Sequence, residues 1–281
     1  MKLNFTKMHG AGNDYVYLDC FQYPMLDHPS DVAVLVSDRH KGIGGDGLIL
    51  IAPSDVADAR MEMYNADGSR AEMCGNGIRC VAKYVFDHKI KNDSHLKIET
   101  DNGVLELELT TVDDKVTHVK VDLGEPILNG TKIPTTFDMN PVVDQMIMAG
   151  GREFLATCVS MGNPHCVVYV DQLSDELVHT YGPMLENDSH FPNRVNIEFI
   201  EIVSDELVKQ RTWERGSGET QACGTGAGAV CVAGVLSGRT KRNVNIQLLG
   251  GDLELEWRES DNHVYKKGPA VEVFNGVFEL K

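Results

Sequence analysis

The sequence of 281 residues is 42% hydrophobic, which is enough apolar material to bury one large core or two ordinary ones. Its formal net charge of -16, with no basic stripe to offset 42 acidic residues, argues against nucleic acid and anionic membranes as partners. The amino-terminal residues lack the apolar core of a secretory signal, and no apolar run approaches the roughly 18 residues of a membrane span. We therefore expect a cytoplasmic protein.

The first half of the sequence contains four features in order. Gly12-Asn13 leads into a strand-like run, and Cys-Gly-Asn-Gly at 74–77 precedes apolar residues at helical spacing. A hairpin is expected around Asn102-Gly103, because Asn-Gly supplies the positive φ of a tight turn. These features predict a mixed α+β domain.

A boundary is indicated next. The stretch 125–144 carries three prolines and a Gly turn without helical periodicity. We expect a connector near 123–150.

The second half then repeats the same features in the same order. Gly162-Asn163 leads into a strand-like run, Cys-Gly-Thr-Gly at 223–226 precedes a helical segment, and a hairpin is expected around Gly250-Gly251. The offsets between matching features are 148 to 150 residues. A nearly constant offset predicts two copies of one domain rather than a coincidence.

Each Cys-Gly-x-Gly motif places a cysteine at the start of a predicted helix. The unpaired N–H groups of a first helical turn and the helix dipole favour an anion such as a carboxylate. The same field favours thiolate over thiol, so we expect a lowered pKa for both Cys74 and Cys223. The other five cysteines lie among apolar residues and are interpreted as small buried hydrophobes, without disulfides or a zinc site.

The glycine-rich motifs allow two other interpretations. The stretch 223–230 and the loop 41–48 resemble phosphate-binding loops, but neither continues into a Gly-Lys-Ser/Thr ending. Tight packing of a helix against a sheet would also explain either motif alone. The duplication at matched positions weakens both.

Two thiols, each with its own carboxylate site, fit one kind of reaction. Removing a proton from one face of a carbon and adding one to the other face requires an acid and a base on opposite sides. Racemases and epimerases perform this chemistry. No pyridoxal-lysine context or metal-ligand spacing is recognisable, so we expect neither a cofactor nor a metal.

Several long segments resemble the diaminopimelate epimerase family, over nearly the whole chain: "FTKMHGAGNDYVYLD", "YNADGSRAEMCGNGIRC", "VSMGNPHCVV", "RVNIEFI", "WERGSGETQACGTGAGAV" and "FNGVFEL". The resemblance implies pyridoxal-independent interconversion of LL- and meso-2,6-diaminopimelate, which serves lysine and peptidoglycan precursor synthesis. It also implies two pseudo-twofold-related domains, each an antiparallel sheet curled round a central helix. The resemblance further implies that the last strand returns to the first domain. The expected domains are therefore 1–122 plus 269–281, carrying Cys74, and 123–268, carrying Cys223.

The resemblance also assigns roles by position. Cys74 and Cys223 match the two acid/base thiols, and His165 and Glu214 match groups that tune them. The residues that match substrate-binding positions are Asn13, Asn65, Gly75, Asn76, Asn163, Asn196, Glu214, Arg215, Gly224 and Thr225. Taken singly, each Asn is more often a turn or cap residue, and Glu214–Arg215 more often a surface ion pair.

Two positions depart from the family pattern. Gly47 stands where some members have Gln, which removes a side-chain contact to substrate, and Phe274 stands where others have a tyrosine linked to dimer formation. A homodimer is still expected. The remaining alternatives are another cofactor-independent racemase of the same architecture, of the proline racemase or PhzF type, and a non-catalytic carboxylate-binding protein.

Overall fold

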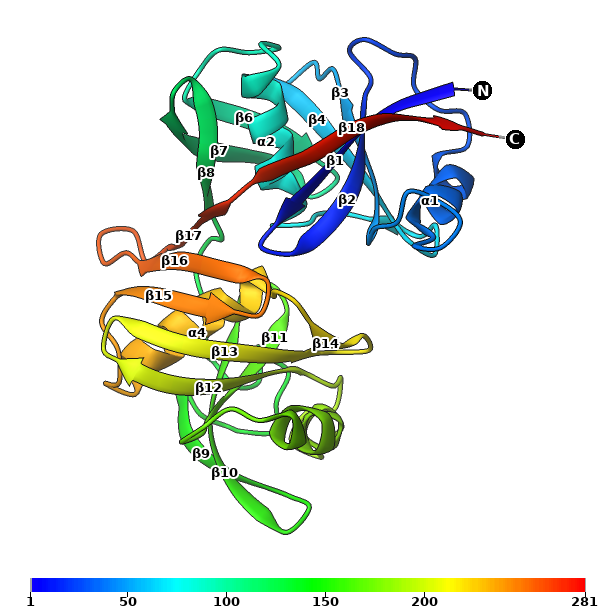
Figure 1. Ribbon diagram of the computed structural model, residues 1–281. Helices are drawn as coiled ribbons and strands as arrows, with labels where there is room; N and C mark the ends of the chain where they lie inside the picture. Colours follow the sequence, from blue (N-terminus) through cyan, green and yellow to red (C-terminus); the bar gives the residue numbers. More distant parts are fainter. Residues whose placement is uncertain (1, 281) are drawn as a thin grey trace. The chain divides into compact units, whose positions relative to one another are not determined.

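The computed structural model describes residues 2–280 and divides into two compact units (Figure 1). Unit 1 consists of Met1–Val121 with Gly268–Lys281, and unit 2 consists of Asp122–Lys267. Within residues 2–280, no helix is both long and apolar enough to cross a membrane.

Unit 1 contains two helices, α1 (Pro29–Ser37) and α2 (Gly77–Asp87). Its strands are β1 (Lys2–Gly10), β2 (Asn13–Asp19), β3 (Gly47–Ala52), β4 (Ala59–Asn65), β5 (Arg70–Ala71), β6 (His95–Thr100), β7 (Gly103–Val112), β8 (Lys115–Asp122) and β18 (Val271–Glu279).

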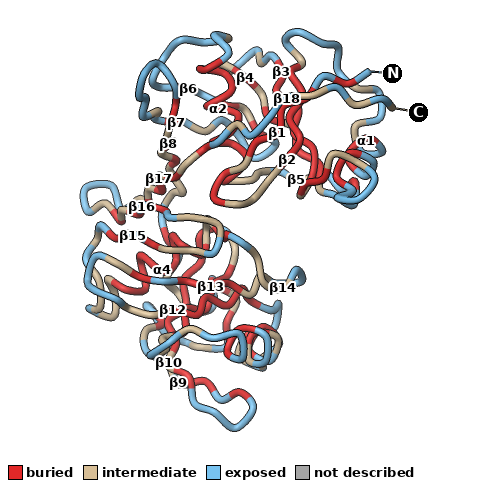
Figure 2. The backbone as a smooth tube through the Cα atoms, viewed as in Figure 1, coloured by how far each residue is buried: buried red, intermediate tan, exposed pale blue. Residues whose placement is uncertain are grey.

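The strands of unit 1 pair in the order β18, β1, β2, β3, β4, β6, β7 and β8, and β5 adds a short pairing to β4. The pairings β2–β3 and β4–β6 are parallel and the others antiparallel. Helix α2 is buried at every position and packs against β1, β2, β4, β6 and β7 (Figure 2). It is therefore the central element of this unit's core.

Unit 2 contains η1 (Leu177–Tyr181), α3 (Gly182–Glu186) and α4 (Gly224–Leu236). Its strands are β9 (Val142–Ala149), β10 (Arg152–Ser160), β11 (Pro164–Tyr169), β12 (Asn196–Ser204), β13 (Leu207–Glu214), β14 (Gly218–Thr220), β15 (Asn243–Leu248), β16 (Gly251–Trp257) and β17 (Val264–Pro269), the last of which ends in unit 1.

The pairing in unit 2 repeats that of unit 1. The order is β9, β10, β11, β12, β13, β15, β16 and β17, with β14 as a short partner of β13. Two parallel pairings, β11–β12 and β13–β15, occupy the places of β2–β3 and β4–β6. Strand β9 corresponds to β18, and α4 corresponds to α2. The α+β class with two similar halves is confirmed, but each sheet is mixed rather than wholly antiparallel.

Both predicted hairpins are present. Strands β6 and β7 meet at Thr100 opposite Gly103, and β15 and β16 meet at Leu248 opposite Gly251. The glycines have φ of 112° and 141°, which side chains other than glycine's rarely allow.

The predicted connector is shorter than expected, because β9 lies inside the range 123–150. Near the end of β9, Ile147 and Ala149 are buried, and Met146 and Met148, which alternate with them, are exposed. At the start of the strand the buried residue is Val142, an even-numbered position, so the alternation of buried and exposed residues changes phase within the strand. A bulge opposite Ala156 and Cys158 causes this change of phase. The strand period of two was therefore not visible in the sequence.

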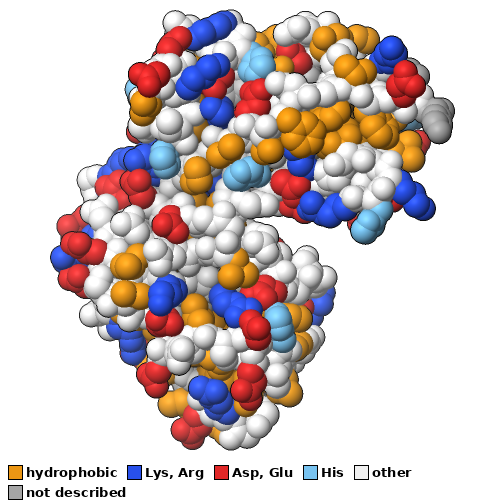
Figure 3. Space-filling view, viewed as in Figure 1, with side chains coloured by type: hydrophobic (Ala, Val, Ile, Leu, Met, Phe, Trp, Pro, Cys, Tyr) orange, Lys and Arg blue, Asp and Glu red, His pale blue; other side chains and the backbone are white. Residues whose placement is uncertain are grey.

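Apolar side chains gather on the surface of unit 1 over β18 and the neighbouring β1 (Figure 3). The exposed apolar residues of β18 are Val271, Val273, Phe274 and Val277. Phe274 also contacts the ring of Phe5 edge-on at 5.8 Å.

Candidate functional site

Cys74 stands at the start of α2, where its backbone and its thiol both contact the first helical turn. Its carbonyl oxygen accepts a hydrogen bond from the N–H of Ile78 at 2.9 Å. Its Sγ accepts one from the N–H of Gly77 at 3.2 Å. A Cβ at Gly77 would lie 2.7 Å from Ile49 Cδ1 and 3.5 Å from Cys74 Sγ, so glycine allows this close approach.

A chain of hydrogen bonds fixes the other side of the Cys74 thiol. The thiol donates to Asn13 Oδ1 at 3.4 Å, and Asn13 Nδ2 donates to Asp46 Oδ2 at 2.6 Å. Asp46 also accepts from the N–H of Asp14 and from Arg39. Because a carboxylate only accepts, Asp46 turns the Asn13 amide so that its oxygen faces the thiol. No local sequence pattern distinguishes Asp46, which stands among the glycines of loop 41–48.

The remaining site residues expected in unit 1 are held by local contacts. Asn65 ends β4 and donates to Ser69 Oγ at 3.0 Å. Asn76 Oδ1 and the carbonyl of Gly75 each accept from Nη1 of the fully buried Arg79 at 2.9 Å. Gly47 lies opposite Asn65, and a Cβ there would collide with the carbonyl oxygen of Tyr64, so this backbone has no room for a glutamine.

Cys223 occupies the matching place before α4. It is the N-cap residue, and its Sγ accepts a hydrogen bond from the N–H of Gly226 at 3.3 Å. The hydroxyl of Thr225 lies 3.6 Å from the same sulfur. In both units a cysteine thiol thus accepts a hydrogen bond from the backbone N–H three residues later, at the start of the central helix, although the N-cap residue is Cys223 in α4 and Asn76 in α2.

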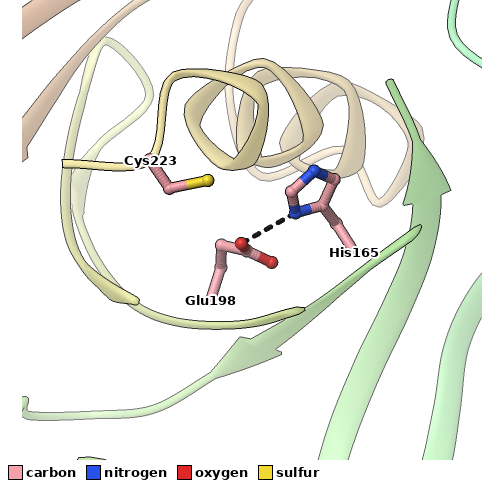
Figure 4. A group of neighbouring side chains, drawn as sticks. All are labelled: His165, Glu198 and Cys223. Carbon is pink, nitrogen blue, oxygen red and sulfur yellow. Dashed lines mark hydrogen bonds and ion pairs between the residues drawn. The ribbon is translucent and has the colours of Figure 1, made fainter. Parts of the chain in front are cut away.

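A second side-chain cluster lies against Cys223 (Figure 4). His165 Nδ1 and Glu198 Oε1 are 2.8 Å apart, and His165 Nε2 lies 3.0 Å from Asn163 Oδ1. One atom each of His165, Glu198 and Cys223 lie within 4.8 Å of one another, and all three residues are buried. Glu198 was not among the residues predicted from the sequence. Its signal was an acidic residue inside the otherwise apolar run "NIEFI".

Among the described residues, His165, Glu198 and Cys223 form the one group of three with the atoms and spacing to share a metal ion. The hydrogen bond between His165 and Glu198 already engages two of the three groups. We assign no metal to this cluster.

The environment of Cys223 opposes its ionisation. Burial raises the pKa of the Cys223 thiol well above its usual value, and the carboxylates of Glu214 and Glu198 add to the rise. The N–H of Gly226 and the hydroxyl of Thr225 act in the opposite direction, but they are outweighed. The expectation of a lowered pKa at this helix start is therefore wrong for Cys223, because burial raises the pKa of the thiol more than the hydrogen bonds at the helix start lower it.

The other site residues expected in unit 2 surround the ends of β11, β12 and β13. Asn196 lies opposite His165 in the sheet, and its Oδ1 accepts from the N–H of Arg215 at 3.0 Å. The Arg215 side chain is exposed and donates to the carbonyl of Asn193 at 3.1 Å. Glu214 accepts from the hydroxyl of Thr220 at 2.7 Å.

A buried cation lies beside the first residue of α4. Lys266 has no exposed surface, and its Nζ occupies the space that a Cβ at Gly224 would need. Only glycine at 224 leaves room for this amino group. No sequence pattern indicates this position of Lys266.

Comparison with known proteins fits this arrangement of paired thiols. The family model described as "Diaminopimelate epimerase" matches residues 5–129 and 157–273. The chain belongs to the diaminopimelate epimerase family. The first matched segment of the chain contains Cys74, and the second contains Cys223.

Relatives named diaminopimelate epimerase are similar over their whole length. The protein of Methanococcus maripaludis strain C6 is 51% identical, covering 99% of this chain and 100% of its own. That of Acetivibrio thermocellus is 52% identical, covering 99% of both chains. That of Brachyspira hyodysenteriae is 52% identical, covering 100% of both.

More distant proteins share the fold. The Bacillus anthracis phenazine biosynthesis protein of the PhzF family has a TM-score of 0.69 at 14% identity, covering 100% of both chains. A methylitaconate-delta-isomerase has a TM-score of 0.67 at 14% identity, covering 99% of this chain and 95% of its own. At this identity the likeness extends to the fold alone.

Proposed function

We propose that this chain interconverts LL- and meso-2,6-diaminopimelate by a two-base mechanism, with Cys74 and Cys223 as its acid/base groups and no pyridoxal cofactor. One observation carries the proposal: in both copies of a duplicated unit, a cysteine thiol accepts a backbone hydrogen bond at the start of the central helix. Family membership and relatives of about half-identical sequence that bear this enzyme's name support it.

In this mechanism the thiolate of one cysteine takes the α-hydrogen as a proton, and the electron pair of the C–H bond stays on carbon. The thiol of the other cysteine then delivers its proton to the opposite face, so the two sulfurs exchange protonation states. The α-carboxylate binds the N–H groups at the helix starts, Gly75-Asn76 and Gly224-Thr225. Their fixed dipoles stabilise the charge that develops beside the carbon.

The other end of the substrate needs its own recognition. We assign the distal carboxylate to Arg215, whose exposed guanidinium can bind it through two parallel hydrogen bonds. Asn196 supports this turn through the backbone of Arg215. Asn13, Asn65, Asn163 and Glu214 supply the further donors and acceptors that an amino acid's ammonium and carboxylate need.

The proposed reaction belongs to lysine and peptidoglycan precursor synthesis, and a cytoplasmic location stays a prediction. We also propose a homodimer. Support comes from the apolar face of β18, where Val273, Phe274 and Val277 are 52%, 47% and 58% exposed. Light scattering of the purified chain would measure its mass.

Incubation with LL-diaminopimelate in deuterated water tests the function directly. We expect the wild type to produce the meso form with deuterium at the α carbon, and Cys74→Ala and Cys223→Ala each to lose at least about 100-fold in turnover. Cys80→Ala and Cys231→Ala are matched controls, since these buried thiols lie inside α2 and α4. A wild type that binds diaminopimelate without α-deuteration would be a binding protein, and full turnover in either single variant would exclude two bases.

A further inference from the structure

The carboxyl group of Glu198 has no role in the mechanism described above. Glu198 pairs with Val167 in the parallel register of β11 and β12, two positions along from the pair His165–Asn196. His165 and Glu198 therefore point to the same face of the sheet, toward the start of α4 (Figure 4). The carboxylate of Glu198 and the sulfur of Cys223 both lie close to Gly226: a Cβ at this glycine would lie 2.5 Å from Glu198 Oε1 and 3.1 Å from Cys223 Sγ.

The charges that face Cys223 come from four strands of unit 2. His165 lies on β11, Glu198 on β12 and Glu214 on β13, and Lys266 on β17 lies against Gly224. Of the two carboxyl groups, Glu198 has His165 as a partner at 2.8 Å. Its second oxygen, Oε2, is buried without a hydrogen-bond partner among the described residues. A carboxyl group that is held by His165 thus lies beside the thiol of Cys223.

We propose that Glu198 keeps Cys223 protonated in the resting enzyme, so that Cys223 begins as the proton donor, and Cys74 acts as the base once it has lost the hydrogen that it donates to Asn13 Oδ1. Two acidic groups buried side by side do not both ionise readily, because each charge disfavours the other. Burial raises the pKa of Glu198, and His165 acts against this rise. Because a carboxyl group ordinarily ionises several pH units below a thiol, the proton stays on Cys223. This inference rests on the proposed function for its catalytic meaning, although the protonation of Cys223 can be measured without turnover.

Glu198 is a positioning residue in this account, since it acts through Cys223 and not on the substrate. After a turnover that starts with the thiolate of Cys74, that sulfur holds the substrate's proton and Cys223 is a thiolate beside the Glu198–His165 pair. This arrangement is less stable than the resting one, and Cys223 regains a proton as Cys74 loses one. Burial and the two carboxylates raise the pKa of Cys223, which agrees with a thiol at rest.

The variant Glu198→Gln keeps the shape of the side chain and removes its charge. We measure the alkylation rate of Cys223 against pH, resolved by mass spectrometry of its peptide, in the full chain with EDTA present. We expect Cys223 to ionise in this variant at a pH about one unit or more below that of the wild type. Glu201→Gln, the same change at an exposed ion pair on the same strand, serves as the control and leaves it unmoved. If Cys223 of Glu198→Gln ionises at the same pH as in the wild type, or at a higher pH, the proposal is wrong.

Turnover gives an independent readout. The alkaline limb of the kcat/KM profile reports loss of the essential acid, so it should move to lower pH in Glu198→Gln, with kcat below that limb within about threefold of wild type. A residue with only a structural role would lower kcat and leave the limb in place, and that result would sink the proposal. Glu198→Asp, which restores the carboxylate, should return the limb toward its wild-type position, and it serves as the second variant if the glutamine chain does not fold.

The two proposals fail differently. If the wild type does not epimerise diaminopimelate but the alkylation of Cys223 shifts as expected, the proposed function is wrong and the influence of Glu198 on the thiol stands. If the wild type epimerises and neither measurement shifts, the assignment of Glu198 is wrong and the function stands.

Discussion

At the scale of single residues, the two thiols have different surroundings despite their matching positions. Cys74 donates to an amide oxygen that Asp46 orients, whereas Cys223 lies beside the carboxylate of Glu198. Family resemblance gave the two sulfurs and Asn13. It gave neither carboxylate, because an acidic residue in a glycine loop or in a strand has many ordinary roles, and only the folded register shows which one faces a thiol.

One prediction at this scale concerns pH. Burial disfavours ionisation of Asp14, but hydrogen bonds from Arg39 and Lys7 outweigh it and hold its pKa below the usual range. A lowered pKa in the folded state stabilises the protein above the unfolded pKa, and this contribution is lost as pH falls through the folded pKa. We expect Asp14→Asn to lower the free energy of unfolding by roughly 1–3 kcal/mol at pH 7. The difference from wild type should shrink below about pH 4, measured by urea denaturation at each pH. A difference that is constant from pH 7 to about pH 3 would contradict this.

At the scale of elements, local signals predicted the parts that are set locally. Asn-Gly and Gly-Gly placed both hairpins, helical spacing of apolar residues after Cys74 placed α2, and a continuous run of small and apolar residues after Cys223 placed α4. The parallel pairings and the equivalence of β9 with β18 were beyond such signals, since they join segments far apart in the chain. The lowered pKa expected for Cys223 failed for the same reason: helix-start geometry is local, but burial and facing carboxylates are tertiary.

The start of α4 offers a prediction at this scale. Gly226→Ala places a methyl group against Glu198 Oε1 and Cys223 Sγ, at 2.5 and 3.1 Å, so these groups must move apart. We expect kcat to fall at least about tenfold, because catalytic groups tolerate little displacement. Gly228→Ala in the same helix is the control, since its Cβ meets apolar side-chain carbons, Leu123 Cδ1 at 3.0 Å and Met161 Cγ at 3.5 Å. Equal activity of the two variants in the deuterium assay would count against close packing at Gly226.

At the scale of the whole molecule, the duplication is completed by strands from different places in the chain. In unit 2 the first strand in the pairing order is β9, which pairs with β10 and directly precedes it in the chain. In unit 1 the corresponding strand is β18, which pairs with β1 and comes from the other end of the chain. Leu3 and Phe5 of β1 belong to the same core cluster that Phe278 and Leu280 cover. Unit 1 therefore depends on both ends of the chain, and unit 2 on neither.

A substitution in β18 tests this dependence. A Cβ at Gly276 would lie 2.7 and 2.8 Å from two ring atoms of Phe5, so Gly276→Val should force that ring out of the core and lower the free energy of unfolding by about 1–3 kcal/mol. Val112→Thr, at a 57% exposed position of β7 in the same unit, is the control and should change stability by less than about 0.5 kcal/mol. Hydrogen exchange should show loss of protection in β1, β2 and β18 while α4 and β12 keep theirs, because stability is local to each cooperative unit. Equal loss of protection across residues 122–267 would mean that the two units unfold as one.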